Sequence, residues 1–293
     1  MSRQQSKGSD PQQSSKSFTN VGGSIIAKTP NLVIRILAES LGKLQYILVM
    51  NSLENQTALV AGGATGIGQA VAQALAKQGC KVAIGGRRLE KLEEAAKTYD
   101  GPGQLHVHTL DVSDRESVAT TVAWCEETLG PVDILVNAAG INIKDRSMAN
   151  MVPEEWDKVI SVNATGAYNI MNAVLPSMRT RQKGIIINVS SIAGKRAIEL
   201  GGIAYCASKF AMTALGTAAG QEEAEHGIRI TNVYPGEVDT PLLLQRPKPV
   251  TDEHRARMLQ PNDVAELVVT ICQLPQRAHV PEIVIKPRTQ AYF

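Results

Sequence analysis

Short strand-like runs of apolar residues alternate with helical stretches along the whole chain after Asn51. The runs are Thr57–Ala61, Lys81–Gly85, Gln104–Leu110, Ile134–Val136, Gly184–Val189, Ile228–Val233 and Glu282–Ile285. Strands separated by helices pair in parallel, because right-handed crossovers place helices on both faces of the sheet. The pattern predicts a single α/β domain over residues 51–293, with a doubly wound, seven-stranded parallel sheet. Such a sheet binds ligands at the carboxyl ends of its strands.

Composition narrows the classes of protein and partner further. Aromatic residues make up only 4% of the chain, so the core must consist mainly of Ala, Val, Ile and Leu. The net charge of +2 comes without a basic block, which argues against nucleic acid as a partner. The four cysteines form no Cys-x-x-Cys pair and the five histidines have no ligand spacing, so we expect no metal site and no disulfide framework. These features favour the reducing cytoplasm.

The first 50 residues differ from the rest of the chain. They are rich in Ser, Gln and Lys up to Asn20 and contain no apolar run near the roughly 20 residues that span a bilayer. Three interpretations remain open: a targeting peptide, an amphipathic docking helix over Leu32–Leu48, or residues upstream of a true start at Met50. We favour the third, because the first expected strand follows Met50 after a short lead-in. We also expect the first 20 residues to be disordered and the chain to have no membrane span.

A glycine-rich turn, Ala61–Gly68, follows the first run and opens a helical stretch. Gly62 permits a tight turn, Gly66 allows backbone amides to approach a pyrophosphate, and Gly68 allows the helix to pack on the strand. The N-terminus of the following helix also favours negative charge. The turn therefore predicts a dinucleotide site, although glycines at such a position also form ordinary turns.

The spacing of this turn resembles the T-G-x-x-x-G-x-G pattern of the short-chain dehydrogenase/reductase family, with Ala61 in place of the Thr. Further matches occur in the family's order along residues 51–293. They are Asn137-Ala138-Ala139-Gly140, Asn163 in Val162–Gly166, Ser190–Gly194, Tyr205-Cys206-Ala207-Ser208-Lys209, and Pro235–Thr240. The resemblance implies a Rossmann fold and an oxidoreductase that moves hydride between a nicotinamide and a carbonyl or secondary alcohol.

The end of the second run indicates which cofactor the chain binds. Gly86 stands where enzymes of this family that use NAD usually place a carboxylate, and Arg87 and Arg88 follow. Two guanidinium groups suit the 2′-phosphate of NADP(H), although they also suit a solvated helix start. Asp111 and Val112 match the pair that faces adenine, while Ser113 and Glu116 have the spacing of a helix cap. The resemblance implies a cofactor site made of Gly62, Thr65, Gly66, Ile67, Gly68, Arg87, Arg88, Asp111, Val112, Asn137, Ala138, Gly140, Tyr205, Lys209, Pro235, Gly236, Val238 and Thr240.

Tyr205 and Lys209 lie four positions apart in a helical stretch, so their side chains share one face. A reduced carbonyl needs a proton, and we expect the Lys209 ammonium to lower the pKa of Tyr205 toward neutrality. The resemblance implies that Ser191 binds the substrate oxygen and that Asn163 holds a water in a proton relay. Ser190 is the rival serine. The 14 positions between Ser191 and Tyr205 exceed the family spacing by one, which indicates an insertion within Lys195–Gly202.

Substrate and assembly are less constrained by the sequence. The Pro-rich stretch Pro241–Gln260 occupies the position of the family's substrate lid. Four basic residues could face an anionic substrate or merely the solvent: Lys195, Arg196, Arg246 and Lys248. The tail Pro275–Gln290 resembles that of NADP-dependent 3-hydroxy acid dehydrogenases. Alternatives are a 3-oxoacyl thioester reductase and a noncatalytic NADP-sensing scaffold. We expect the helices around Glu155–Met178 and Tyr205–His226 to pair in a homodimer or homotetramer.

Overall fold

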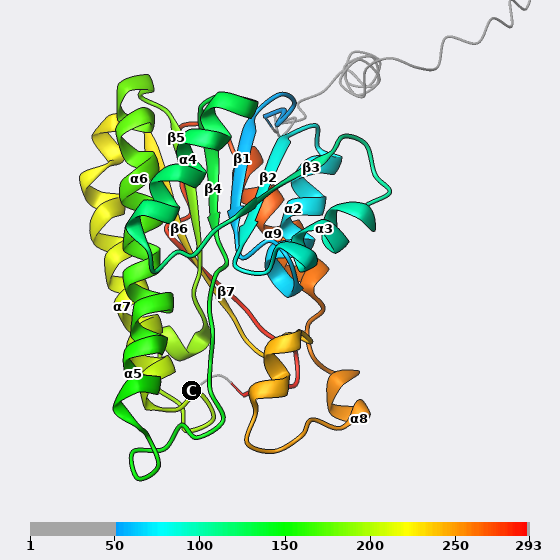
Figure 1. Cartoon of the computed structure of the whole chain (residues 1–293), viewed down its shortest axis with the longest axis vertical. Coiled ribbons are helices and arrows are strands. Elements are labelled where there is room, and N and C mark those ends of the chain that lie inside the picture. Colours follow the sequence, from blue (N-terminus) through cyan, green and yellow to red (C-terminus); the bar gives the residue numbers. More distant parts are fainter. Residues whose placement is uncertain (1–50, 292–293) are drawn as a thin grey trace, which may run out of the picture. The chain divides into compact units, whose positions relative to one another are not determined.

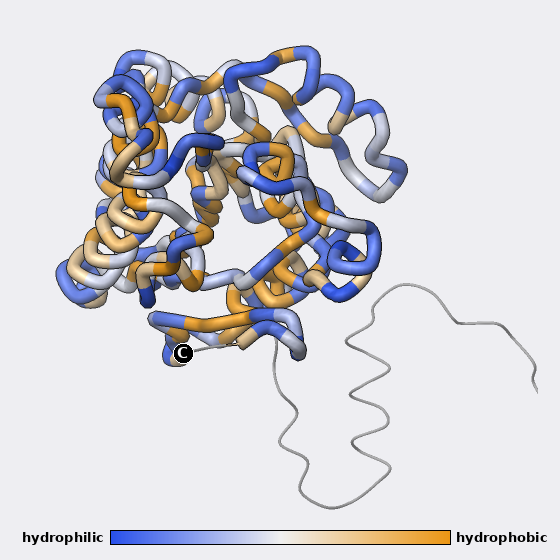
Figure 2. Tube along the Cα trace, turned by 90° about the horizontal axis from the view of Figure 1, so that it is seen from below, coloured by the Kyte–Doolittle hydropathy of each residue, from blue (hydrophilic) through white to orange (hydrophobic). Residues whose placement is uncertain are grey.

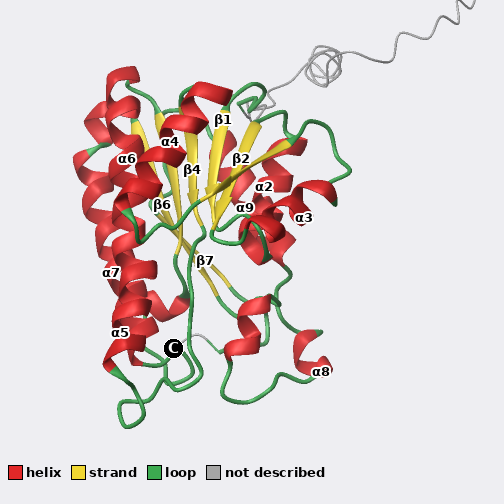
Figure 3. Ribbon diagram, in the orientation of Figure 1, coloured by secondary structure: helices red, strands yellow, loops and turns green. Residues whose placement is uncertain are grey.

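The computed structural model describes residues 51–291, so the N-terminal extension of residues 1–50 lies outside the described residues. A single seven-stranded parallel sheet runs through this region in the order β3-β2-β1-β4-β5-β6-β7 (Figure 3). Its strands are β1 Thr57–Ala61, β2 Lys81–Gly86, β3 Leu105–Thr109, β4 Val132–Asn137, β5 Gly184–Val189, β6 Ile228–Pro235 and β7 Glu282–Ile285. The predicted doubly wound α/β architecture is confirmed.

Helices cover both faces of the sheet (Figure 1). One face carries α2 (Gly66–Lys77), α3 (Leu89–Lys97) and α9 (Pro261–Gln273). The other carries α4 (Arg115–Leu129), α6 (Gly166–Arg181) and α7 (Ile203–Glu222). The shorter helices α5 (Pro153–Ile160) and α8 (Asp252–Arg255) belong to the connections that follow β4 and β6. The chain therefore forms three layers, with the sheet in the middle.

Each face of the sheet has its own aliphatic core. In β5, Gly184–Val189, every residue is buried, and three consecutive isoleucines alternate between the two faces. Branched side chains suit such positions because they pack well on a pleated surface, and fully burying one stabilises the fold by about 1.5–3 kcal/mol. Figure 2 shows hydrophobic residues concentrated toward the interior of residues 51–291 and hydrophilic residues on its outer segments. The scarcity of aromatic residues is thus matched by a core of Ala, Val, Ile and Leu.

The strand order creates a crevice at one edge of the sheet. From β1 the chain moves outward to β2 and β3, then returns to place β4 on the other side of β1. The connections after β1 and β4 therefore leave in opposite directions, which opens space beyond the carboxyl ends of these two strands. This edge receives the glycine turn and the loop that follows Asn137.

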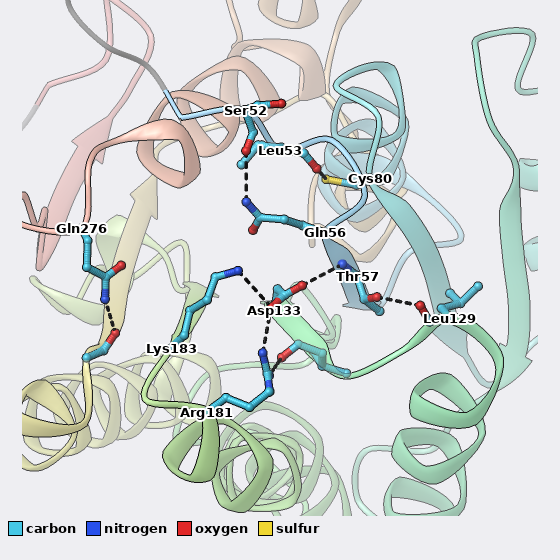
Figure 4. A network of polar contacts seen from close by, with 12 residues as sticks. Ser52, Leu53, Gln56, Thr57, Cys80, Leu129, Asp133, Arg181, Lys183 and Gln276 are labelled. Atoms are coloured by element: carbon cyan, nitrogen blue, oxygen red, sulfur yellow. Dashed lines mark hydrogen bonds and ion pairs between the residues drawn. The ribbon is translucent and has the colours of Figure 1, made fainter.

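A polar network closes the opposite, amino edge of the sheet (Figure 4). The Asp133 carboxylate accepts hydrogen bonds from the Thr57 backbone N–H at 3.2 Å, from Arg181 Nη1 at 2.8 Å and from Lys183 Nζ at 3.3 Å. Thr57 Oγ1 in turn donates to the Leu129 carbonyl at 3.0 Å. These contacts join the starts of β1 and β4 to the end of α6, so the strands are aligned from the edge that lies away from the crevice.

Some local expectations were wrong. The helix expected around Glu155–Met178 is present, but a π-helical turn over Ser161–Thr165 divides it into α5 and α6. The cap expected at Ser113 lies at Asp114, whose carboxylate accepts from the Glu116 N–H at 2.9 Å. The strand β4 begins at Val132 because Asp133, which interrupts the apolar pattern, is satisfied by its cationic partners.

Candidate active site

The glycine turn between β1 and α2 packs too closely for side chains. At Gly62, where φ is 80°, a Cβ would lie 2.7 Å from the backbone carbon of Ala138. At Gly68 a Cβ would lie 2.2 Å from the Gly62 carbonyl oxygen. The turn is pinned to β2 because the Gly62 N–H donates to the Gly85 carbonyl at 2.8 Å. Its tightness leaves the N-terminus of α2, which no side chain caps, available to an anion.

This turn forms one wall of a cavity of about 280 Å³, which we call the glycine-turn groove. Twelve of the residues predicted to bind the cofactor line it: Gly62, Thr65, Gly66, Ile67, Gly68, Arg87, Arg88, Asp111, Val112, Ala138, Gly140 and Thr240. The groove thus combines a helix N-terminus, two guanidinium groups and one carboxylate, which is a suitable set for a phosphorylated dinucleotide. Asn137 and Lys209, which belong to the same predicted set, are buried and do not line the groove.

The end of β2 has room for a side chain that the sequence lacks. A Cβ on Gly86 would meet only Leu92 side-chain atoms, at 3.7 and 4.0 Å, so packing does not require glycine at this position. Partial burial acts to raise the pKa of Asp111, but hydrogen bonds from Ser113 and the charge of Arg87 keep it below its ordinary value. Asp111 is therefore an anion that lines the groove together with Arg87.

A second cavity, of about 150 Å³, adjoins the groove, and we call it the inner cavity. Ser191 and Tyr205 line it, as do Pro235, Gly236 and Val238 from the predicted cofactor set. Ile67, Thr240 and Leu242 line both the inner cavity and the glycine-turn groove. A ligand in the groove therefore shares a wall with whatever lies beside Tyr205.

The helix α7 places Lys209 one turn after Tyr205. Lys209 is buried, its Nζ donates to the Val189 carbonyl at 2.9 Å, and this nitrogen lies 5.8 Å from the centroid of the Tyr205 ring. Burial lowers the pKa of Lys209 to about 8. A Cβ on Gly140 would lie 3.6 Å from Lys209 Nζ, so the ammonium lies directly behind the groove.

The two neighbouring serines differ in their contacts. Ser190 Oγ lies 3.2 Å from the Lys209 carbonyl and 3.3 Å from Thr213 Oγ1, which ties the end of β5 to α7. Ser191 Oγ accepts from the Ala193 N–H at 3.1 Å, and Ser191 acts to lower the pKa of the Tyr205 phenol. This influence on the phenol distinguishes Ser191 from its rival.

The electrostatics of Tyr205 differ from the sequence expectation. Burial raises the pKa of its phenol, while the hydrogen bond to Ser191 and the charge of Arg146 act to lower it. The direction is upward because the phenol has lost water. Arg146 acts on the phenol as a cation, and the expected Lys209 lies with its Nζ 5.8 Å from the ring centroid. The sequence analysis missed Arg146, since it stands alone in a loop and belongs to no motif.

Asn163 lies in the π-helical turn and is buried. Its Oδ1 accepts from the Ile141 N–H at 2.8 Å, and its Nδ2 donates to the Ile141 carbonyl at 2.9 Å and to Ser208 Oγ at 3.0 Å. The amide therefore holds the loop that follows β4 against α7. Single π-helical turns frequently occur at functional sites, but no periodicity in the sequence indicates one.

Among the basic residues expected to face an anionic substrate, Lys195 and Arg246 form ion pairs with carboxylates. Lys195 forms an ion pair with Glu282, and Arg246 Nη2 lies 2.8 Å from Glu237 Oε1. Lys248 lines a larger cavity of about 970 Å³, the outer cavity, which shares Arg146 and Arg246 with the inner one. Arg196 is exposed.

Residues 51–291 contain neither a metal-binding cluster nor a helix that could span a membrane. In this region, three or more His, Cys, Asp or Glu side chains nowhere gather in a way that could hold a metal ion. None of its helices combines the length and the apolar character that crossing a bilayer requires.

Lys209→Met is expected to change how stability depends on pH. The folded protein disfavours the charged amine, since burial lowers its pKa from 10.5 to about 8. Between about pH 8 and pH 10.5 the amine is protonated in the unfolded chain and neutral in the folded one. The wild type therefore gains stability as the pH rises through this window. Methionine cannot titrate, so from pH 7 to 10 the wild type should gain about 2 kcal/mol relative to the variant. Urea unfolding of both proteins at pH 7 and at pH 10 measures their free energies of unfolding. The prediction is contradicted if the difference between wild type and variant is the same at both pH values.

Comparison with known proteins gives a consistent result. An uncharacterised oxidoreductase of Staphylococcus saprophyticus is 37% identical over 240 residues, which cover 81% of this chain and all of the relative. The closed form of a serine dehydrogenase complexed with NADP+ superposes with a TM-score of 0.73 at 30% identity, covering 81% of this chain and 97% of that one. A 3-ketoacyl-(acyl-carrier-protein) reductase from Brucella melitensis complexed with NADH gives 0.73 at 28% identity, with coverages of 81% and 99%.

A sequence model of the short chain dehydrogenase family matches residues 56–249. The match includes the glycine turn, the strand-end motifs and the helix that carries Tyr205 and Lys209. With the all-parallel sheet and the two adjoining cavities, it establishes the family. The chain belongs to the short-chain dehydrogenases/reductases, and it is an oxidoreductase of that family.

Proposed function

We propose that the protein is an NADP(H)-dependent oxidoreductase that acts on a carbonyl or a secondary alcohol. The observation that supports this most directly is the wall shared by the glycine-turn groove and the inner cavity, formed by Ile67, Thr240 and Leu242. When bound, the nicotinamide supplies or accepts the hydride. The groove accommodates the cofactor, and the inner cavity presents Ser191 and Tyr205 to the substrate.

Each polar residue of the site has a separate task in this proposal. Ser191 hydrogen bonds the substrate oxygen, and Tyr205 donates the proton that the reduced carbonyl needs. Lys209, held by the Val189 carbonyl, places a positive charge behind the cofactor ribose. Asn163 positions the Ile141 backbone and continues the proton path through a water. Arg146 favours the ionised form of Tyr205, which reduction leaves behind.

We also assign selectivity for NADP(H) to Arg87 and Arg88. The space beside Gly86 is open, and a carboxylate in that space would repel a 2′-phosphate. The two guanidinium groups at the groove instead offer charge-assisted, planar donors to it. An NADP+-bound serine dehydrogenase among the similar structures supports this assignment, whereas an NADH-bound reductase at comparable similarity makes a direct measurement necessary.

The substrate class that we favour is a small 3-hydroxy or 3-oxo acid, in line with the similarity to a serine dehydrogenase. A 3-oxoacyl thioester is the second candidate, favoured by the similarity to a 3-ketoacyl reductase and by the outer cavity, which offers room for a long acyl carrier. Oxo acids, aldehydes and oxoacyl thioesters should be tested as a panel, with NADPH or NADH consumption read by absorbance. If NADPH binds but no member of the panel is turned over, the noncatalytic NADP sensor is the better explanation.

We propose that the protein assembles as a homodimer or homotetramer through α6 and α7. Tyr168 on α6 and Phe210 on α7 are 46% and 42% exposed in the single chain, and large apolar side chains of this kind favour protein interfaces. Light scattering on the full chain should therefore give a multiple of the 31.4 kDa subunit mass. Tyr168→Lys with Phe210→Lys should shift the protein toward monomer, and a wild type that is an active monomer at micromolar concentration would contradict the proposal.

We place the protein in a reducing compartment such as the cytoplasm. All four cysteines are free and buried, and burial raises the pKa of Cys80, Cys125 and Cys272 to about 12. These thiols are unreactive and contribute to packing.

A further inference from the structure

Arg146 is a buried cation whose charge the surrounding protein leaves uncompensated. It is 8% exposed, and its guanidinium donates to three main-chain carbonyls: Ile143 at 2.8 Å from Nε, Leu200 at 2.7 Å from Nη1, and Gln245 from Nη2. These bonds account for three of its five N–H groups. Within residues 51–291 no carboxylate forms an ion pair with it. An arginine held only by neutral acceptors keeps its full charge.

The place of this charge is the wall of the inner cavity. Arg146 lines that cavity together with Ser191 and Tyr205, and it does not line the glycine-turn groove. A cofactor phosphate in the groove is therefore not its partner. The three carbonyls come from the loop after β4, the loop before α7 and the segment after β6, so the guanidinium is fixed from three sides. A cation fixed in this way needs little reorganisation to bind a ligand.

Arg246 lines the same cavity and adds a second positive charge. Its Nη2 lies 2.8 Å from Glu237, and this carboxylate also lies 2.9 Å from His254 Nε2. Glu237 is the sole acidic residue that lines the inner cavity of the described chain. Burial lowers the pKa of Arg146, and the nearby charge of Arg246 lowers it further. The two guanidinium groups thus repel each other and leave the cavity with a net positive charge, which an anion would neutralise.

We propose that Arg146, supported by Arg246, binds a carboxylate of the substrate and so makes the enzyme selective for small oxo or hydroxy acids over their neutral esters. This inference rests on the proposed function, because it assigns a recognition group within the same cavity. The reacting oxygen would lie at Ser191 and Tyr205, and the carboxylate at the two arginines of the same lining. The cavity of about 150 Å³ offers roughly ten times the space that one water needs, which suits an acid of a few carbons.

Acid and ester pairs provide the test. Values of kcat/KM are measured with NADPH for pyruvate, acetoacetate and levulinate and for their methyl esters, with the full-length wild type and with Arg146→Gln, Arg146→Lys and Arg246→Gln. We expect the wild type to prefer the acids. The acid-to-ester ratio should fall about 10- to 100-fold in Arg146→Gln, which is the loss of one charge-assisted contact. Arg146→Lys should have a ratio between those of Arg146→Gln and the wild type. Arg246→Gln should also have a lower ratio than the wild type.

The ratio separates recognition from other effects of the substitution. A change in the fold or in the pKa of Tyr205 alters acid and ester turnover alike and leaves their ratio unchanged. Arg257→Gln is the matched control, because Arg257 lies near Arg246 in sequence, donates through Nε to the Glu253 carbonyl and lines neither cavity. Its ratio should equal that of the wild type. If Arg146→Gln does not fold, Arg246→Gln alone still tests the proposal.

Two outcomes would overturn the inference. The first is a wild type that reduces esters as well as or better than acids, and the second is a ratio that neither arginine changes; both leave the proposed oxidoreductase function intact. If no carbonyl compound is turned over, the proposed function fails instead. Calorimetric titration of malonate in the presence of NADP+ then decides whether the carboxylate site exists. Malonate binding that Arg146→Gln weakens at least tenfold, with no binding of dimethyl malonate, supports the site. Absent or unchanged malonate binding overturns it.

Discussion

Replacing Tyr205 with Phe is expected to lower kcat for carbonyl reduction by about 10²- to 10⁴-fold or more. The phenol lines the inner cavity together with Ser191, so it is placed to protonate the substrate oxygen. Phenylalanine keeps the ring but cannot donate a proton, and a positioned acid contributes about this factor to a reaction. Turnover is measured with saturating NADPH and the best substrate of the panel.

Tyr99→Phe is the control for this substitution. Its hydroxyl donates to the Pro102 carbonyl at 2.8 Å on the surface, and it lines none of the three cavities. The control should keep its activity, and both variants should bind NADPH like the wild type. Normal turnover in Tyr205→Phe would refute the proposed mechanism.

Replacing Arg87 with Gln is expected to raise the Kd for NADPH about 10- to 100-fold and to leave the Kd for NADH nearly unchanged. The reason is the loss of a charge-assisted contact with the 2′-phosphate, worth roughly 1.5–3 kcal/mol. Fluorescence titration of the reduced cofactors gives both constants. Lys91→Gln removes a charge from α3, the helix that follows Arg87, at a residue that is paired with Glu94 outside the groove, and it should change neither constant.

Gly86→Asp tests the same assignment from the opposite direction. The open space at this position allows the side chain, and the new carboxylate should repel the 2′-phosphate while accepting hydrogen bonds from an unphosphorylated ribose. Its preference should therefore shift toward NADH. If Arg87→Gln weakens both cofactors equally, Arg87 supports the fold rather than selecting the cofactor.

The sequence predicted those parts of the structure that depend on local pattern. The runs Thr57–Ala61, Gly184–Val189 and Glu282–Ile285 match β1, β5 and β7 residue for residue, because apolar stretches bounded by turn residues have few alternatives in an α/β fold. The fold and the family followed from the order of motifs. The roles of the individual site residues remain predictions, even where the structure brings their side chains together.

Other features depend on contacts between distant segments, and the sequence could not show them. The π-helical turn around Asn163 forms where this amide meets the Ile141 backbone, which no helical periodicity encodes. Arg146 gains its place from carbonyls as far away as Gln245. The pKa of Tyr205 was expected to fall because only the neighbouring cation was visible in the sequence, whereas burial raises it.

The Asp133 network at the amino edge has a consequence for how this protein can change over evolutionary time. Arg181, Lys183 and Thr57 align the strands from the side away from the cavities, so the loops at the reactive rim carry little responsibility for register. The loop Lys195–Gly202 contacts Arg146 through the Leu200 carbonyl, whereas the register of β5 is set by its backbone pairing with β4 and β6. Descendants of this chain can therefore lengthen or reshape the rim to admit new substrates without first rebuilding the scaffold beneath it.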